Sequence, residues 1–281
     1  MQRAADVMRT KVACLPAQDL KTSVLRAIQL CLPDAAGTLG GQRLLVKPNT
    51  NSPDPYPAST DPVFLTALIE VLHELGTADI MVGDSCGLAW QPAQAVHEKL
   101  GIPDLCRRLG VRYVNFDAGP WRNVPVGGRE LKNVQIAEAA FQADRIVYTC
   151  CLKTHRLARF SASLKHAAGF LSPEMRSRLH DGDLESNIAD INLAVKPDLI
   201  FIDARKCFVT GGPVRGWVRR PGVVFASTDR VAVDVEAARR LSSFWAFNRL
   251  PKNPWDHPQV RHAIALGLGA SREGEYEVVK G

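Results

Sequence analysis

The sequence predicts an α/β protein whose mostly parallel or mixed sheet is flanked by helices. Short, continuous apolar runs alternate with amphipathic stretches along the whole chain. Such runs are typical of strands that are buried on both faces of a sheet. Strands that alternate with helices form βαβ units, in which neighbouring strands run parallel.

The apolar runs predict strands at residues 11–15, 44–47, 80–83, 111–116, 145–151, 199–203 and 223–226. In a parallel sheet, ligands bind at the edge where the strands end at their carboxyl termini. We therefore look for a site in the loops that follow Val46, Val82, Val147 and Ile202.

The clearest helical pattern covers residues 61–75, where apolar side chains recur on one face at Phe64, Leu65, Leu68, Ile69, Leu72 and Leu75. Thr60 or Asp61 is placed to cap its start, and Pro62 suits its first turn. Gly76 is placed to end it.

Two further helices are expected at residues 230–241 and 259–266. Thr228-Asp229 caps the first of them, and Asp234 within it is expected to be a structural hydrogen-bonding group. The proline-rich stretch 51–62 and the glycine- and arginine-rich stretch 210–221 predict loops. The first of these loops follows a strand end, so we expect it to cover that end.

The chain of 281 residues exceeds the usual size of a single core. We expect one unit over residues 1–281, with lobes 1–120 and 121–281 as the division if there is one. The loop around Gly119-Pro120 is the best candidate for a hinge between them.

The net charge of +6 raises the question of a polyanionic partner. The basic residues are spread out and lack the interleaved aromatic residues of a single-strand binder, which argues against nucleic acid. A local basic pocket for a small anionic ligand is the better use of this charge. The oligomeric state stays open.

Cysteines and apolar runs bear on the compartment. The seven cysteines are odd in number and irregularly spaced, which fits reduced thiols better than a disulfide framework. No CxxC pair is present, so the chain has no ligand set for a ferredoxin-type cluster. The apolar runs are too short to span a bilayer and no secretory segment opens the chain, so we expect a cytoplasmic protein without a membrane partner.

Polar residues follow two of the predicted strands. Lys47-Pro48-Asn49 places an ammonium and an amide at a strand end, where they could grip a carboxylate or phosphate, although a turn formed by proline explains the same residues. The small residues of Gly83–Gly87 would let backbone amides approach a ligand closely. Within that stretch, Asp84 is expected to orient a neighbour or a metal-bound water, or to cap the loop, and Ser85 is expected to bind the ligand.

The densest chemistry lies in residues 153–169, expected as a loop after strand 145–151. Basic and hydroxyl side chains gather there: Lys153, His155, Arg156, Ser161, Lys165 and His166. His180 follows fifteen residues after Lys165. Crowded cations lower each other's pKa, so a lysine among them can act as a base or as a covalent anchor near neutral pH. Histidines supply acid, base or metal-ligand groups.

Three residues at neighbouring strand ends are weighed separately. Asp203 ends a predicted strand and is a candidate supporting group. Cys150 and Cys151 could be soft metal ligands, but adjacent strand residues face opposite sides, so buried packing is the expected role for both.

These pieces, in this order, resemble the family known as domain of unknown function 362. The motifs are VKPN, TDP, VGDS, KTH, SxxLK followed by a glycine, an isolated histidine near Arg178, FIDA, GGP and ASTDRVAVD, from about Leu44 to about Leu241. Some members of that family carry appended ferredoxin-like cysteine clusters, which this chain lacks.

A more distant similarity is to the nickel-dependent lactate racemases. His155, Ala158, Phe160, Ser161 and Lys165 match their central motif, in which the lysine anchors a nickel cofactor. The resemblance implies that His180 is a metal ligand and that Lys47-Pro48 corresponds to a substrate-gripping Arg-Pro. The stretch 84–87 lacks the histidine pair of the racemases.

The leading hypothesis is an enzyme that acts on a small carboxylate-bearing substrate by racemase-like isomerase or oxidoreductase chemistry. Lys165 would be the covalent anchor or base, with His155 and His180 as acid/base groups or metal ligands. Lys47 would grip the anion, and a bound metal would be nickel, iron or zinc. The alternative is a non-catalytic binding or carrier protein for an anionic metabolite, cofactor or metal.

Overall fold

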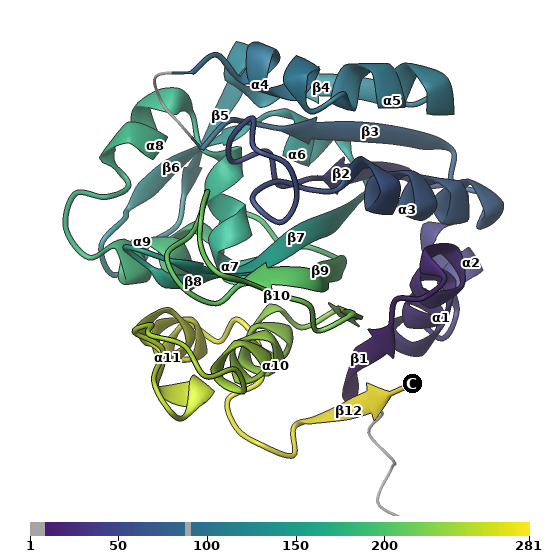
Figure 1. Cartoon of the computed structure of the whole chain (residues 1–281). Helices are drawn as coiled ribbons and strands as arrows, with labels where there is room; N and C mark the ends of the chain where they lie inside the picture. Colours follow the sequence, from purple (N-terminus) through teal and green to yellow (C-terminus); the bar gives the residue numbers. More distant parts are fainter. Residues whose placement is uncertain (1–8, 88–90) are drawn as a thin grey trace, which may run out of the picture.

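The computed structural model of the chain describes residues 9–87 and 91–281. Within these ranges ten strands form one sheet, whose main path runs β12-β1-β11-β9-β7-β2-β3-β4 (Figure 1). The main strands are β1 (Thr10–Pro16), β2 (Arg43–Lys47), β3 (Asp79–Asp84), β4 (Arg112–Asn115), β7 (Arg145–His155), β9 (Leu199–Phe208), β11 (Val223–Ser227) and β12 (Tyr276–Lys280).

The sheet is mixed, with a parallel half that carries the strand ends of interest. Strands β9, β7, β2, β3 and β4 run parallel to one another, whereas β11 is antiparallel to both β9 and β1. The short strands β8 (Arg159–Ser161) and β10 (Val218–Arg219) pair antiparallel with the ends of β7 and β9. The predicted α/β class and mixed sheet are therefore confirmed.

Two apolar cores lie on opposite faces of the sheet because successive strand residues point to opposite sides. On β2, Leu44 and Val46 belong to the core covered by α1, α3 and α5, whereas Leu45 belongs to the core covered by α9, α10 and α11. Burial on both faces explains why the strands read as continuous apolar runs.

The first core is covered by α1 (Leu20–Cys31), α2 (Ala35–Leu39), α3 (Pro62–Glu74) and α5 (Ile102–Leu109), with α4 (Ala93–Lys99) beside α5. The other helices are α6 (Ala139–Gln142), α7 (Ser163–His166), α8 (Pro173–Arg178), α9 (Leu184–Ile191), α10 (Arg230–Ser242) and α11 (Pro258–Ala265). Short 3₁₀ turns are η1 (Phe116–Ala118), η2 (Ala167–Phe170) and η3 (Pro254–Asp256).

The predicted helix caps are confirmed. The Asp61 carboxylate accepts a hydrogen bond from the Val63 amide, 3.0 Å away, at the start of α3. Asp229 accepts hydrogen bonds from the amides of Val231 and Ala232 at the start of α10. Residues 51–62 form the expected loop, and the helix expected at 259–266 runs from Pro258 to Ala265.

Two strands extend beyond the ends that we predicted for them. Each pairs, past its predicted end, with a short strand that the apolar pattern does not reveal. Strand β7 continues through Lys153 to His155, where it pairs with β8, and its register shifts between Cys151 and Lys153. Lys153 to His155 are therefore strand residues and not the loop that we expected. Strand β9 continues to Phe208 in the same way, beside β10.

Both sides of the expected hinge contribute to the same sheet, since β1 to β4 precede residue 120 and β7 to β12 follow it. Between them, β5 (Trp121–Pro125) and β6 (Asn133–Ala137) form a separate two-stranded sheet. The lobes 1–120 and 121–281 stay a prediction. None of the described helices is long and apolar enough to cross a bilayer.

Candidate functional site

A cavity of about 310 Å³ lies at the carboxyl edge of the parallel strands. It is formed where β2, β3 and β7 end side by side, which is where a parallel sheet binds ligands. Its walls include ten of the candidate site residues of the sequence analysis, though not Asp203: Lys47, Asn49, Asp84, Ser85, Lys153, His155, Arg156, Ser161, Lys165 and His180.

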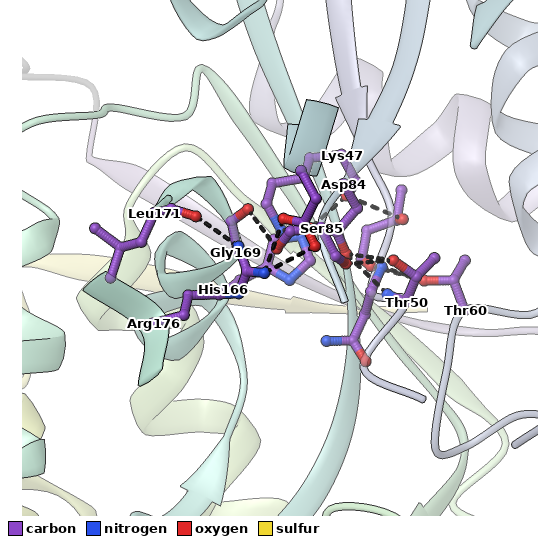
Figure 2. A network of polar contacts seen from close by, with 12 residues as sticks. Lys47, Thr50, Thr60, Asp84, Ser85, His166, Gly169, Leu171 and Arg176 are labelled. Carbon is purple, nitrogen blue, oxygen red and sulfur yellow. Dashed lines mark hydrogen bonds and ion pairs between the residues drawn. The ribbon is translucent and has the colours of Figure 1, made fainter. Parts of the chain in front are cut away.

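A buried ion pair forms one wall. The Lys47 ammonium at the end of β2 lies 2.7 Å from a carboxylate oxygen of Asp84 at the end of β3, and both side chains are almost fully buried (Figure 2). The Lys47 nitrogen also lies 5.3 Å from the centre of the Phe170 ring. Because the charge of Lys47 is balanced by Asp84, it has less to offer a ligand than its position in the sequence suggests.

The second carboxylate oxygen of Asp84 is held by Thr50. It accepts hydrogen bonds from the Thr50 amide at 2.8 Å and from the Thr50 hydroxyl at 2.9 Å. Burial raises the pKa of Asp84, but the charges of Lys47 and His166 and these hydrogen bonds outweigh burial and hold that pKa below its ordinary value. Asp84 is therefore an ionised structural partner.

Behind Thr50 a hydrogen-bond chain leads away from the cavity. The Thr50 hydroxyl lies within 2.9 Å of two acceptors, Asp84 and the Ser85 carbonyl, and 2.8 Å from His97 Nε2. Thr50 has one hydroxyl proton, so His97 donates from Nε2. Its Nδ1 lies 2.7 Å from the Tyr113 hydroxyl, which also lies 3.1 Å from the Gln94 side-chain oxygen. Burial lowers the pKa of His97, which agrees with a neutral ring.

Gly169 closes over the ion pair. A Cβ atom at this position would lie 2.5 Å from the Asp84 carboxylate and would also collide with the Lys47 ammonium, so only glycine fits. The Gly169 carbonyl accepts a hydrogen bond from the Ser85 hydroxyl at 2.8 Å. His166 Nε2 lies 2.9 Å from the Lys47 carbonyl, which fixes the following turn against β2. Figure 2 shows these contacts together.

Lys153 points from β7 into the same space. Its buried ammonium donates to the Asn49 side-chain oxygen at 2.8 Å and to the Ala58 carbonyl. No carboxylate among residues 9–87 and 91–281 forms an ion pair with it. Burial lowers the pKa of Lys153, and two neutral oxygens hold what charge it carries.

Lys165 lies on the short helix α7, and two buried side chains fix that helix. Asp234 on α10 accepts hydrogen bonds from the amides of Ser163 and Leu164 at 2.7 and 2.9 Å. Asn192 donates to the Leu164 carbonyl at 2.9 Å. Asp234 thus has the structural hydrogen-bonding role that we expected, and that role is to position Lys165.

The Lys165 amine has an unusual electrostatic environment. Burial together with the charges of Lys153 and Lys47 lowers its pKa to about 8. No described carboxylate is close enough to offset these effects. An amine with this pKa is partly neutral near physiological pH and can act as a base or a nucleophile.

His155, at the end of β7, has its ring oriented by the backbone. Its Nδ1 accepts hydrogen bonds from the amides of Leu157 and Ala158 at 3.2 and 3.1 Å, so the proton of the neutral ring is on Nε2. Burial and the nearby lysines, Lys165 first, lower its pKa to about 2. In this orientation His155 is a hydrogen-bond donor, which argues against its expected roles as a base and a metal ligand.

The mouth of the cavity carries more basic groups. Arg156 and His180 are exposed there, and burial and the nearby Lys165 lower the pKa of His180. Arg176 also lines the cavity, but it is paired with Asp117 at 2.8 Å. Pro213 from the 210–221 stretch also lines the cavity.

The walls are strongly electropositive as a whole. The described lining residues include one carboxylate, Asp84, against five lysines and arginines: Lys47, Lys153, Arg156, Lys165 and Arg176. After the two ion pairs are set aside, Lys153, Arg156 and Lys165 have no carboxylate partner among the residues that the structure describes. A small anion is the ligand that this arrangement favours.

Asp203 lies outside the cavity lining, and its expected supporting role in the site is wrong. Its carboxylate binds the Arg205 guanidinium at 2.7 Å and accepts from the Tyr56 hydroxyl at 2.7 Å. Arg205 also reaches Asp61 at 2.8 Å, so the cluster fastens the proline-rich loop to the end of β9. Cys150 and Cys151 are buried, and burial raises the pKa of both thiols, as expected for packing residues.

Sequence reasoning passed over Thr50, Asn51 and His97 as site residues. Asn51 lines the cavity, and its side-chain nitrogen is buried with no hydrogen-bond partner among the described residues. Thr50 and Asn51 directly follow the KPN motif, so their place after a strand end was a usable signal. His97 lies on α4, far along the chain, and nothing local marks it.

A metal ion held by protein side chains alone does not fit the described residues, where no group of three or more His, Cys, Asp or Glu is placed to bind one. A tethered cofactor would have Lys165 as its anchor and His180 at the rim as its ligand. Nickel, iron or zinc therefore stays a prediction that rests on the resemblance, and we derive no chemical step through a metal.

Comparison with known proteins identifies the family. Residues 44–239 match the family model described as domain of unknown function, DUF362. The chain belongs to this family. The match begins at β2 and ends within α10, so it includes Lys47, Lys165 and Asp234. The predicted membership is confirmed, and the family description assigns no activity.

Comparison also finds one protein of similar sequence and two solved structures of similar fold. A thylakoid-associated protein from Synechocystis sp. is 25% identical over 240 residues, which cover 81% of this chain and 73% of that protein. A structure from Thermotoga maritima matches with a TM-score of 0.50 at 15% identity, covering 81% of this chain and 59% of that one. The lactate racemase apoprotein from Thermoanaerobacterium thermosaccharolyticum matches with a TM-score of 0.45 at 13% identity, over 74% and 53% of the two chains.

These structural matches concern the fold alone, because sequence identity is low. The chain spans little more than half the length of each solved structure, 59% and 53%. What those longer proteins do is therefore not carried over.

Proposed function

We propose that this DUF362 protein is an enzyme that binds a small carboxylate-bearing substrate and uses the Lys165 amine as a base or covalent anchor. The observation that carries the proposal is the placement of Lys165 in the cavity wall with a pKa lowered to about 8. At pH 7 about one tenth of such amines are neutral. An ordinary solvated lysine would be neutral in fewer than about one molecule in a thousand.

The groups around Lys165 suit recognition of a carboxylate. Lys153 and Arg156 supply positive charge and have no carboxylate partner in the described part of the chain, and the His155 Nε2–H supplies a neutral donor. The unsatisfied side-chain nitrogen of Asn51 is a further donor in the same walls. Together they offer charge and directed hydrogen bonds to an anion that enters the cavity.

Proton transfer is the simplest chemistry for this arrangement. The neutral Lys165 amine takes the proton from the carbon beside the substrate carboxylate, and the electron pair of the broken C–H bond stays on the substrate as an enolate. The cationic walls stabilise that added negative charge. The resulting ammonium returns the proton to the same carbon, and return to the opposite face would invert it.

The test is hydrogen exchange in deuterated buffer. The protein is incubated with a panel of small 2-hydroxy carboxylates, and proton NMR follows the signal of the hydrogen on the carbon beside the carboxylate. The expected result is exchange with the native protein and none with Lys165→Met, while Lys252→Met, which removes an exposed lysine, keeps the native rate. Exchange that survives Lys165→Met would refute the assignment.

A binding or carrier protein is the second candidate, and a specific observation favours it. Asp84 is the one carboxylate among the described lining residues and is already paired, and His155 is held as a donor, so Lys165 is left as the main candidate base. If carboxylates bind to the native protein but show no exchange and no adduct on Lys165, the carrier reading replaces the enzyme. Metal analysis of the same purified protein tests the predicted nickel, iron or zinc.

A further inference from the structure

The segment that follows α10 presents aromatic side chains to solvent. Its residues alternate, with Phe244 and Ala246 against the core and Trp245 and Phe247 pointing outward. Trp245 is 76% exposed and Phe247 is 79% exposed, and their ring centres lie 5.5 Å apart. Exposed apolar side chains that cluster are typical of surfaces that bind a protein, a membrane or a ligand.

Two neighbouring segments extend this apolar surface. The Asn248 side chain donates to the Val209 carbonyl at 3.1 Å, and the Val209 amide donates to the Trp217 carbonyl at 2.9 Å, which brings Trp217 alongside. The Arg249 guanidinium donates to the Arg156 carbonyl, which ties in the residues at the cavity mouth.

We call the aromatic–basic surface the exposed side chains of these three segments. Its apolar members are Leu157, Trp217, Trp245 and Phe247, and its basic members are Arg156, Arg215, Arg219 and Arg249. Acidic residues do not occur between positions 206 and 228 or between 237 and 255 of the sequence. The surface therefore combines apolar groups with charge of one sign.

We propose that the aromatic–basic surface binds the face of an anionic lipid bilayer. Tryptophan rings prefer the headgroup region, where their apolar body and polar N–H are both satisfied. Arginines around them are attracted to anionic headgroups. The aliphatic side chain of Leu157, 56% exposed, gains from burial among acyl chains.

A single-stranded nucleic acid fits this surface less well. Stacking of bases needs open aromatic faces arranged along a groove. The Trp245 and Phe247 rings instead contact each other edge to face, at an interplanar angle of 64°. The charges alone would serve either polyanion, so the apolar residues decide in favour of lipid.

The position of the surface links membrane binding to the cavity. Arg156 and Leu157 belong both to the surface and to the cavity lining, and Pro213 and Val214 of the lining precede Trp217 in the same segment. A bilayer bound here would lie next to the cavity mouth. We expected no membrane partner from the sequence because only membrane-spanning segments were considered. The alternation of buried and exposed residues at 244–250 was a usable signal for a surface-binding segment.

Vesicle flotation with the full chain tests the proposal. Vesicles of phosphatidylcholine alone are compared with vesicles of equimolar phosphatidylcholine and phosphatidylglycerol, at low and at high salt. The expected result is binding to the anionic vesicles that weakens with salt. Arg219→Gln with Arg249→Gln should lower the partition coefficient about five-fold for each arginine removed, and Trp245→Ala with Phe247→Ala should lower it at least as much.

Matched controls separate this surface from general effects. Val63→Ala removes an apolar residue that is 61% exposed on α3, and Arg107→Gln with Arg108→Gln removes two exposed arginines on α5. Both controls should bind vesicles like the native protein. Absence of binding to anionic vesicles, binding that all variants retain, or retention by single-stranded DNA in place of vesicles would each overturn the proposal.

Discussion

The Lys47 ammonium lies 2.7 Å from the Asp84 carboxylate, and the two residues come from the carboxyl ends of adjacent parallel strands. Both side chains are nearly inaccessible, with 1% and 5% exposure. Removing one partner of such a pair leaves an uncompensated buried charge, which usually costs about 3–5 kcal/mol. The pair is thus part of the structure that shapes the cavity.

Lys47→Met should therefore lower the free energy of unfolding by about 3–5 kcal/mol, as measured by urea denaturation. The double variant Lys47→Met with Asp84→Asn should lose less than the sum of the two single variants, because neither charge is left alone. As a control, Lys21→Met removes an exposed pair with Glu74 and should cost less than about 1 kcal/mol. Additive single effects would show that the two residues are not coupled.

Asp234→Asn tests how Lys165 is positioned. The two carboxylate oxygens of Asp234 accept from two α7 amides, whereas asparagine has one acceptor oxygen, so one amide loses its partner at a cost of about 1–3 kcal/mol. Because α7 carries Lys165, this variant should also weaken carboxylate binding. Asp229→Asn, which disturbs the cap of α10, should cost stability while carboxylate binding stays as in the native protein.

The Asp234 carboxyl also predicts a pH dependence of stability. Burial raises its pKa to about 7 in the folded chain, from an unfolded value of 3.8. Between these values the folded state holds a proton that the unfolded state has lost, so stability should fall as the pH rises from about 4 to about 7. Urea unfolding at several pH values should show this slope in the native protein and a smaller slope in Asp234→Asn.

The strand ends could be predicted from the sequence because buried parallel strands leave continuous apolar runs, and the rule that ligands bind at their carboxyl edge led to Lys47, Asp84 and Lys165. The pairing of Lys47 with Asp84 could not be predicted, since it depends on β2 and β3 being neighbours in the sheet. The partner of Asp203 was also out of reach, because Tyr56 lies 147 residues away in the chain.

His155 shows a different limit of sequence reasoning. Residue type suggested an acid, base or metal ligand, but the chemistry depends on which ring nitrogen faces the backbone. That orientation follows from the turn at Leu157 and Ala158, where β7 reverses into β8. No pattern of residue types specifies it.

The variant His155→Asn should distinguish the structural role of Nδ1 from the ligand-binding role of Nε2–H. The asparagine oxygen can accept the Leu157 and Ala158 amides in place of Nδ1, so the turn should persist, while the donor that Nε2–H offers to the cavity is lost. Carboxylate affinity should fall about ten-fold, as expected for one hydrogen bond to a charged group, by isothermal titration calorimetry. Unchanged affinity would mean that His155 does not contact the ligand.

Lys165 predicts the pH dependence of the site itself. Its pKa is lowered to about 8, so the rate at which acetic anhydride labels its amine should rise with pH and reach half its maximum near pH 8. Free Nα-acetyl-lysine in the same mixture should reach half its maximal rate near its ordinary pKa of about 10.4. Mass spectrometry measures the acetylation of the Lys165 peptide and of the free amino acid in the same sample. Removal of a neighbouring cation by Lys153→Met should move the Lys165 midpoint upward, because that charge is the second largest cause of the shift.

The same shift has a consequence for folding that runs in a definite direction. Between about pH 8 and the ordinary lysine pKa of 10.5 the unfolded chain holds a proton on Lys165 that the folded chain has lost, so this residue should make stability rise with pH across that window. Lys165→Met should remove this contribution and stabilise the fold below pH 8, where the native protein must bury a charge. If Lys165→Met is instead destabilising near neutral pH, the ammonium has a counter-ion in the folded state, and the argument for a reactive amine fails with it.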